Sequence, residues 1–142
     1  MSATDLAAGI VRTFEGCRLK SYKDIGGIWT IGWGHTGPEV VEGLIWTQEQ
    51  ADMALALDLN KAGGQVGHLV MGRLSDQQLG ALISFEFNLG ALGSSTLLKL
   101  VNGGEFLAAT REFVIWDHVS RNEIKGLLKR RLTEALMFVN GS

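Results

Sequence analysis

The sequence contains little cysteine, little proline and no long apolar run. Its 142 residues include one cysteine, Cys17, and one proline, Pro38. One cysteine cannot form an internal disulfide, so we expect the fold to depend on a packed core and to form in a reducing compartment. No apolar run approaches the roughly 18 residues that cross a membrane. The first residues, Met1-Ser2-Ala3-Thr4-Asp5, also lack the basic and apolar regions of a secretory signal.

An excess of charge of one sign is also missing. The chain has 15 acidic and 13 basic residues, which gives a net charge of −2. Because this balance offers nothing to attract nucleic acid, we expect no nucleic-acid partner. Basic residues do concentrate between Arg121 and Arg131. This stretch is interpreted as the solvated face of a helix, and the alternative is a weak contact with anionic polymer or lipid of a cell envelope.

What the sequence does contain is helical periodicity around one short β region. Apolar residues spaced by three and four up to Phe14 predict a first helix, which Gly16 would end. Arg18 to Tyr22 and Ile28 to Trp33 have strand character and are separated by a turn. The expected fold class is therefore α+β and mostly α. Capping boxes and apolar periodicity predict later helices at about residues 47–62, 75–90, 95–102, 105–116 and 123–139.

Two features of these helices lead to specific expectations. The helix at about 47–62 should end at Gly63-Gly64, because glycine is a poor helix former. Glu86 and Arg131 interrupt the apolar faces of their helices. Since an unpaired buried charge is costly, we expect them to pair with each other, or Arg131 to reach the region of Glu15. The last helix should bury an apolar stripe, which consists of Ile124, Leu127, Leu128, Leu132, Ala135, Leu136 and Val139.

Three residues near the end of the first helix have side chains suited to hydrolysis. Glu15 closes that helix, where the negative end of the dipole and the neighbouring Phe14 favour a protonated carboxyl group. Asp24 lies in a polar turn and should stay ionised, while Thr30 offers a hydroxyl from a strand. Splitting a glycosidic bond with water requires one carboxyl group that keeps its proton and one that does not. Taken singly, each residue also has a purely structural interpretation: an ion pair, an Asx-turn and strand propensity, respectively.

The spacing of these three residues, with the motifs that follow them, resembles the phage-type lysozymes of glycoside hydrolase family 24. Gly32-Trp33-Gly34-His35 comes directly after the hydroxyl residue Thr30. Glu86 departs from the family pattern, which usually has a small or apolar residue there. The other segments similar to the family are Ser84–Gly90, Ser95–Leu98, Phe113–Trp116 and Gly126–Arg131, so that the resemblance covers about residues 5–139.

The resemblance implies roles for individual residues. Glu15 would be the catalytic acid, Asp24 the carboxylate that positions water, and Thr30 the third member of the site. Contacts with saccharide would come from Thr36, Phe87 and Thr96. Structural residues near the site would be His35, Glu86 and Arg131.

The resemblance also implies a single lysozyme-like domain over residues 1–142. A β-containing lobe at about 15–46 and a helical lobe at about 63–142 would border the active-site groove, with a connecting helix at about 47–62. The implied activity is that of an endolysin, which hydrolyses the β-1,4 bond between N-acetylmuramic acid and N-acetylglucosamine in peptidoglycan, with inversion at the anomeric carbon. The alternatives are a lytic transglycosylase and a non-catalytic protein that binds the wall or disrupts the envelope. We expect a monomer that is made in the host cytoplasm and acts on the cell wall after release.

Two further patterns are each typical of a ligand site, but the sequence around them does not fit such a site. Gly32 to Gly37 matches the dinucleotide fingerprint Gly-x-Gly-x-x-Gly, yet Pro38 and a polar loop follow it where a helix would be needed. The histidines His35, His68 and His118 have no metal-ligand spacing with one another or with a cysteine. We therefore expect neither a metal nor a cofactor.

Overall fold

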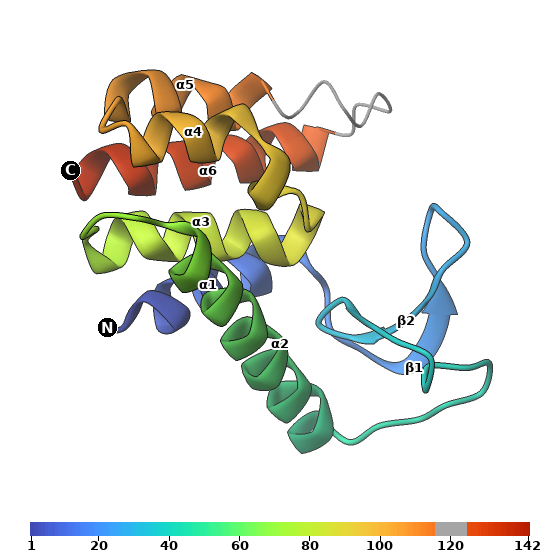
Figure 1. Ribbon diagram of the computed structural model, residues 1–142. Coiled ribbons are helices and arrows are strands. Elements are labelled where there is room, and N and C mark those ends of the chain that lie inside the picture. The colour runs from blue at the N-terminus through green and yellow to red at the C-terminus, as the bar shows by residue number, and fades with distance from the viewer. Residues whose placement is uncertain (116–124) are drawn as a thin grey trace.

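The computed structural model describes residues 1–115 and 125–142, with side chains from residue 128 onward in the second range. Helices dominate, and a small antiparallel sheet lies to one side of them (Figure 1). Trp116, Asp117, His118, Arg121 and Ile124, like the side chains of 125–127, lie outside the described residues. The elements are α1 (Ala3–Phe14), β1 (Arg18–Lys23), β2 (Trp29–Gly32), β3 (His35–Thr36), α2 (Gln48–Leu69), α3 (Asp76–Leu89), the 3-10 turn η1 (Leu92–Ser94), α4 (Thr96–Asn102), α5 (Phe106–Ile115) and α6 (Lys125–Asn140).

Three of the helices begin with the same reciprocal hydrogen-bond pattern. Ser2, Thr47 and Ser75 each accept a backbone hydrogen bond three residues on, and the side chain there bonds back to the cap. These capping boxes satisfy N–H groups that a helix start leaves free. The two boxes expected from the sequence, at Thr47 and Ser75, are therefore confirmed. At the other end of α3, Gly90 adopts the left-handed conformation with φ 62° and stops the helix.

Helix α2 is longer than the sequence predicts. The expected end at Gly63-Gly64 is wrong, because α2 passes through both glycines and ends at Leu69, a total of 22 residues. Burial explains the difference, since Ala62 and Val66 on either side of the glycines are buried in the core. A Cβ atom on Gly63 would lie 3.5 Å from Ile83 Cδ1 and 3.7 Å from Thr4 Cγ2, so α1 and α3 pass close to this turn. Tertiary packing here outweighs the low helix propensity of glycine.

The sheet has the order β1-β2-β3, with antiparallel neighbours. Tyr22 of β1 pairs with Thr30 of β2, and Thr30 in turn pairs with Thr36 of β3. The register between β1 and β2 shifts between Arg18 and Tyr22, which marks a bulge. The two longer strands and the turn at 24–28 are close to the sequence prediction, and they bring Tyr22, Thr30 and Thr36 to adjacent positions.

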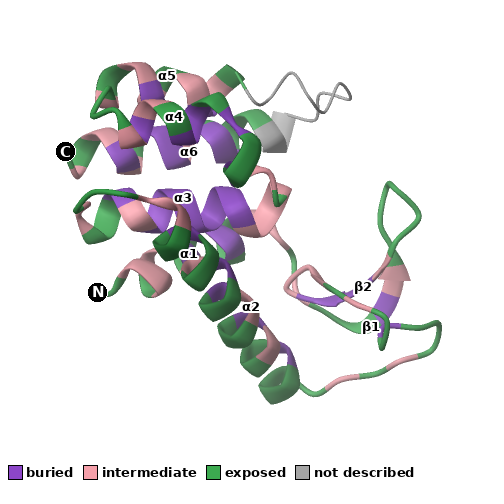
Figure 2. Ribbon diagram, viewed as in Figure 1, coloured by how far each residue is buried: buried purple, intermediate pink, exposed green. Residues whose placement is uncertain are grey.

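The main core lies in the helical part of the molecule, around α3 (Figure 2). This helix contacts α1, α2 and α6, and residues Ala81 to Glu86 are all buried. Aromatic rings continue the core into α5 and α6, where Phe113 packs edge-on against Phe85 and also against Phe138. None of the helices in the described ranges is long and apolar enough to cross a membrane.

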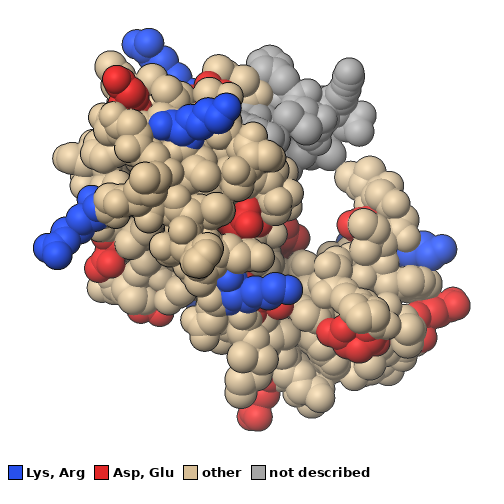
Figure 3. Space-filling model, viewed as in Figure 1, with Lys and Arg blue, Asp and Glu red and all other residues tan. Residues whose placement is uncertain are grey.

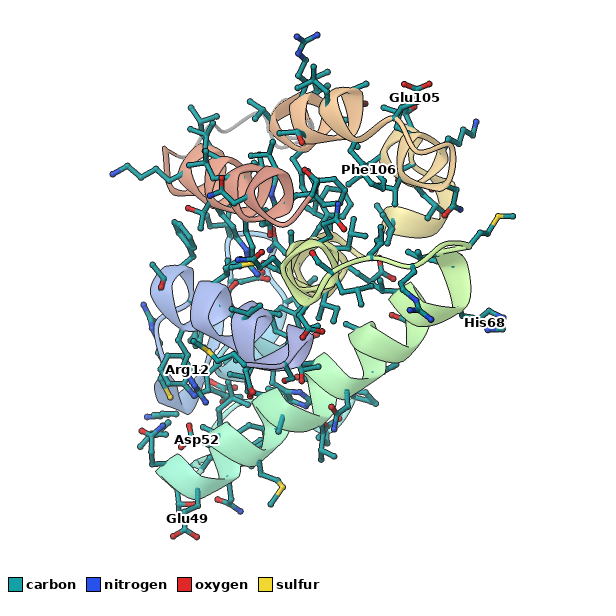
Figure 4. All side chains as sticks on the ribbon, turned by 90° about the vertical axis from the view of Figure 1, so that its left-hand side faces the viewer. Arg12, Glu49, Asp52, His68, Glu105 and Phe106 are labelled. Carbon is teal, nitrogen blue, oxygen red and sulfur yellow. The ribbon has the colours of Figure 1, made fainter. Side chains whose placement is uncertain are left out.

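Trp33 connects the end of β2 to the first two helices. Its indole N–H donates to Asp52 Oδ1 of α2 at 2.8 Å, and the Arg12 guanidinium of α1 lies 5.8 Å from its ring centroid. Figure 4 shows Arg12 and Asp52 on neighbouring helices, with Glu49 and His68 toward the two ends of α2. The sheet is thus attached to the helices by specific contacts next to Gly34.

Helix α6 buries a different face from the one the sequence predicts. Leu128, Leu132 and Leu136 of the expected apolar stripe are 37%, 42% and 61% exposed, although Ala135 is buried as expected. The buried face also contains three charged residues and an aromatic one, namely Arg130, Arg131, Glu134 and Phe138. Hydrophobic periodicity misplaced this face because the charges compensate one another in the interior.

Candidate active site

Glu15 lies where the two parts of the molecule meet. It follows α1 directly, and its backbone N–H donates to Val11 O at 2.7 Å, so the helix end holds its main chain. Its side chain is 27% exposed, and Oε2 accepts a hydrogen bond of 3.1 Å from Arg130 Nη1 of α6. On the other side, a Cβ atom added to Gly34 would lie 2.9 Å from Oε1. The carboxyl group is therefore confined between a buried cation and a glycine backbone.

Arg130 is itself fixed by a buried network. The side chain is 2% exposed, and its Nη2 lies 3.4 Å from both the carbonyl oxygen and Oγ of Ser84. Glu134 is fully buried one turn later on α6; it accepts from Ser84 Oγ at 2.5 Å and from Arg131 Nη2 at 2.8 Å. Burial raises the pKa of Glu134, while the Arg131 and Arg130 guanidiniums act against that rise. Since paired buried charges have strict geometric demands, this network holds Arg130 in one position.

The partners of the two charges singled out in the sequence differ from expectation. Arg131 contacts Glu134, with Nε 2.7 Å from Oε1, and it is the adjacent Arg130 that reaches Glu15. Glu86 is buried as expected, but its Oε1 accepts from the backbone N–H of Leu92 at 3.0 Å. The expected contacts of Arg131 with Glu86 or Glu15 are thus replaced by others, because neighbouring helix positions point in different directions.

Asp24 and Thr30 are joined through the backbone of one residue, Ile28. Asp24 Oδ1 accepts from the Ile28 N–H at 2.9 Å, and the Thr30 hydroxyl donates to the Ile28 carbonyl oxygen at 2.9 Å. Asp24 is exposed in its turn, whereas Thr30 is only 4% exposed in β2. The strand–turn geometry therefore holds a carboxylate and a hydroxyl in a fixed relation.

Tyr22 is a residue of the site that the sequence reasoning did not select. Burial raises the pKa of its phenol, and the negative charges of Glu15 and Asp24 raise it further, against the effect of Arg18. The Arg18 guanidinium lies 4.3 Å from the centre of the Tyr22 ring. The phenol thus experiences the field of both candidate carboxylates. Its position opposite Thr30 follows from the register of β1 and β2, which the sequence analysis did not predict.

A cleft adjoins Gly34, the residue that packs against Glu15, although Glu15, Asp24 and Thr30 are not among the residues that line it. A cavity of about 240 Å³ is lined by Gly34 and Thr36 of the β region, by α2, and by Glu86 and Phe87 of α3. Figure 3 shows the surface hollowed between the helical part and the β region, with charged atoms of both signs along it. Two of the expected saccharide contacts, Thr36 and Phe87, therefore line one cavity. Thr96 is exposed at the start of α4 and is not among the residues that line it.

A family comparison covers the part of the chain that contains these candidate residues. The model of the family described as phage lysozyme matches residues 12–134. The chain belongs to the phage lysozyme family.

Individual relatives and solved structures are also similar to most of this chain. The endolysin of Acyrthosiphon pisum secondary endosymbiont phage 1 is 36% identical over 135 residues, which cover 91% of this chain and 92% of that protein. The endolysin of Bacillus phage B103 is 35% identical over 99% of this chain, but this chain spans only 55% of that relative's length. The muramidase domain of SpmX from Asticaccaulis excentricus is 32% identical, with a TM-score of 0.81 and coverage of 94% of each chain.

His35 connects the β region to α2 beside this phage lysozyme cleft. Its Nδ1 lies 2.7 Å from Asp58 Oδ2 and its Nε2 lies 2.6 Å from Glu39 Oε2, while the ring rests against Trp46. Burial acts to lower the pKa of His35, but the hydrogen bonds to Glu39 and Asp58 outweigh it, so that the pKa is raised overall. These contacts favour a charged imidazole that holds β3 against α2.

Proposed function

We propose that this protein is an endolysin that hydrolyses the β-1,4 bond between N-acetylmuramic acid and N-acetylglucosamine in peptidoglycan. Membership of the phage lysozyme family supports the reaction class. The observation that carries the residue assignment is the confinement of Glu15 between Arg130 and Gly34 at the cleft, with Asp24 and Thr30 on the neighbouring turn and strand.

Glu15 acts as the acid in this proposal. Its carboxyl group protonates the glycosidic oxygen, so that the leaving sugar departs as an alcohol. Arg130 binds Oε2 and Gly34 leaves room beside Oε1, which directs one oxygen toward the cleft. Positioning of this kind lowers the barrier because the reacting atoms are aligned before the reaction begins.

Asp24 and Thr30 hold the attacking water. The Thr30 hydroxyl donates a hydrogen bond to the Ile28 carbonyl oxygen. The lone pairs of the hydroxyl oxygen can therefore accept a hydrogen bond from water. Asp24 has one oxygen engaged by the Ile28 N–H and a second oxygen to accept the other water proton. The water oxygen attacks the anomeric carbon from the face opposite Glu15 while Asp24 takes up one water proton. The bond to the leaving sugar breaks at the same time, so the configuration is inverted.

The test is a turbidity assay on Gram-negative cells whose outer membrane has been stripped. Glu15→Gln keeps the shape of the side chain but removes the proton donor, so we expect the clearing rate to fall by about 10²–10⁴-fold. Glu42→Gln changes an exposed glutamate of the β region and should clear at the wild-type rate. Normal clearing by Glu15→Gln would contradict the proposal and favour a protein that only binds or disrupts the envelope.

The proposal extends to location and assembly: a monomer made in the host cytoplasm that reaches the wall after release.

For the basic stretch Arg121–Arg131, the burial of Arg130 and Arg131 removes two of its charges from the surface. Lys129 is the exposed cation of that stretch among residues whose side chains are described. A weak envelope contact would therefore depend on fewer charges than the sequence suggests.

A further inference from the structure

A pocket that the proposed reaction does not use lies between the first half of α2 and the loop that precedes this helix. Its volume is about 530 Å³, and it is lined by residues of β3, of the loop 37–47 and of α2 as far as Asp58. Among the described residues, it shares only Asp58 with the cavity beside Gly34, and none of those that line it belongs to α3. The pocket is therefore distinct from the cleft at which the reaction is proposed.

Part of the lining of this pocket is apolar, although it is open to solvent. Met53 and Leu57 lie one turn apart on α2 and are 63% and 61% exposed. Trp46, just before the helix, adds an aromatic ring to the same lining. Single exposed apolar side chains are common on protein surfaces, but several that line one pocket are typical of a binding site.

The charged residues that line the pocket are acidic, apart from one histidine. Glu39 and Asp58 contact the two ring nitrogens of His35, at 2.6 Å and 2.7 Å. Glu49 is exposed in the first turn of α2, and no lysine, arginine or histidine of the described residues forms an ion pair with it. Because the described lining includes no lysine or arginine, it keeps an excess of negative charge even when His35 is protonated.

These features together select a class of ligand. The carboxylates favour a cation, and the aromatic ring of Trp46 also attracts positive charge. Met53 and Leu57 favour an apolar body, and the volume lies in the range of roughly 300–1,000 Å³ that is typical of small-molecule sites. We propose that this pocket binds a small organic cation with an apolar body, whose charged group lies beside Glu49 and whose body covers Met53 and Leu57.

The test is NMR of the full chain with carbon-13 in the methionine methyl groups, titrated with hexyltrimethylammonium. Of the four methionines, Met53 lines the pocket, whereas Met71 is 82% exposed and does not line it. The Met53 signal should shift and saturate with a dissociation constant of about 1 mM or lower, while the Met71 signal stays in place. Spermidine, a cation without an apolar body, and 1-hexanol, an apolar body without charge, should each bind at least about tenfold more weakly.

Two pairs of variants at exposed positions locate the site. Leu57→Gln should raise the dissociation constant about tenfold, whereas Leu107→Gln, which alters a leucine of α5 that is 63% exposed, should leave it unchanged. Glu49→Gln should raise it about threefold, because a surface ion pair contributes little. Glu105→Gln removes an exposed carboxylate at the opposite end of the molecule and should have no effect (Figure 4).

Three results would each overturn the inference. The first is a shift of the Met53 and Met71 signals to the same extent, and the second is equal affinity of the wild type and Leu57→Gln for hexyltrimethylammonium. The third is a Met53 signal that moves as the protein concentration rises without any probe, which would show that a second copy of the chain occupies the pocket. The inference is independent of the proposed reaction, since Glu15, Asp24 and Thr30 do not line this pocket.

Discussion

At the scale of single residues, the backbone of Gly34 decides how much space the Glu15 carboxyl group has. Gly34 has φ +87°, and an added Cβ atom would lie 2.9 Å from Glu15 Oε1 and 3.0 Å from its Cδ. Gly34→Ala should therefore displace the carboxyl group and lower kcat by about 10-fold to 100-fold, in addition to a loss of about 1 kcal/mol of stability. Steady-state kinetics on soluble glycan strands measures the first effect, and urea denaturation the second.

The chain provides a matched control for Gly34. Gly43 has nearly the same backbone angle, φ +84°, but a Cβ atom there would meet nothing within 4 Å. Gly43→Ala should lose a similar amount of stability and keep its activity. Equal kinetic losses in the two variants would mean that backbone strain, and not contact with Glu15, explains the effect.

Arg130 is the residue that connects Glu15 to the buried network. Replacing it by methionine leaves Glu134 with one guanidinium fewer and Glu15 without its partner. We expect Arg130→Met to lower the free energy of unfolding by about 3 kcal/mol and kcat by at least about tenfold. The exposed neighbour Lys129→Met should change stability by less than about 0.5 kcal/mol. Urea denaturation and kinetics on the same protein samples check both values. If Arg130→Met had the stability and kcat of the wild type, the network would be needed for neither.

Single residues also show where prediction from sequence stops. Local patterns placed Glu15 at a helix end, Asp24 in a turn and Thr30 in a strand, because each placement depends on nearby residues. The choice between Arg130 and Arg131 as the partner of Glu15 depends on how α6 rotates against α3 and α1. That rotation is set by contacts across 115 positions of sequence, which no local pattern contains.

At the scale of elements, α2 shows that packing can carry a helix through adjacent glycines. Gly64 is exposed within α2, and a Cβ atom there would meet nothing within 4 Å. Gly64→Ala should thus raise the free energy of unfolding by about 0.5–1 kcal/mol, because alanine loses less conformational entropy on entering a helix. Urea denaturation measures this gain. A loss of stability would mean that the chain leaves the helical conformation at Gly63-Gly64, as the sequence alone suggests.

The contact of β3 with α2 should depend on pH. The pKa of His35 is raised above the usual histidine value of about 6.5, since its hydrogen bonds to Glu39 and Asp58 outweigh the effect of burial. Protonated His35 therefore stabilises the folded protein fully below about pH 6.5, and this stabilisation is lost as the pH rises through the higher pKa of His35 in the folded state. The stability difference between wild type and His35→Gln should be larger at about pH 5.5 than at about pH 9.

Urea denaturation at the two pH values tests this prediction, and a second histidine, His68, provides the control substitution. His68 is exposed near the C-terminal end of α2 (Figure 4). The change with pH should be larger for His35→Gln than for His68→Gln, because His35 contacts two carboxylates, Glu39 and Asp58. A His35→Gln difference that is constant with pH would contradict a charged imidazole between Glu39 and Asp58.

At the scale of the whole molecule, the order of the helices along the chain could be predicted, but the faces with which they pack against one another could not. Capping residues and periodicity are local and located most of the helix starts, as at Thr47 and Ser75. The buried face of α6 was misjudged because Glu134 pairs with Arg130 and Arg131 along the helix, while Glu15 and Ser84 add partners that reach α6 only in the folded chain. The cleft likewise joins Thr36, Lys61 and Glu86 from separate elements, so it exists only in the folded chain.

The central claim is that Glu15 drives hydrolysis of the glycan by water at this cleft. Its most direct test is mass spectrometry of purified peptidoglycan digested in water enriched in oxygen-18, with wild type beside Glu15→Gln. We predict that the wild type produces N-acetylmuramic acid reducing ends that carry the heavy oxygen, and that Glu15→Gln produces almost none. Products that end in 1,6-anhydro sugar without the label, or labelled ends formed equally by both proteins, would contradict the account.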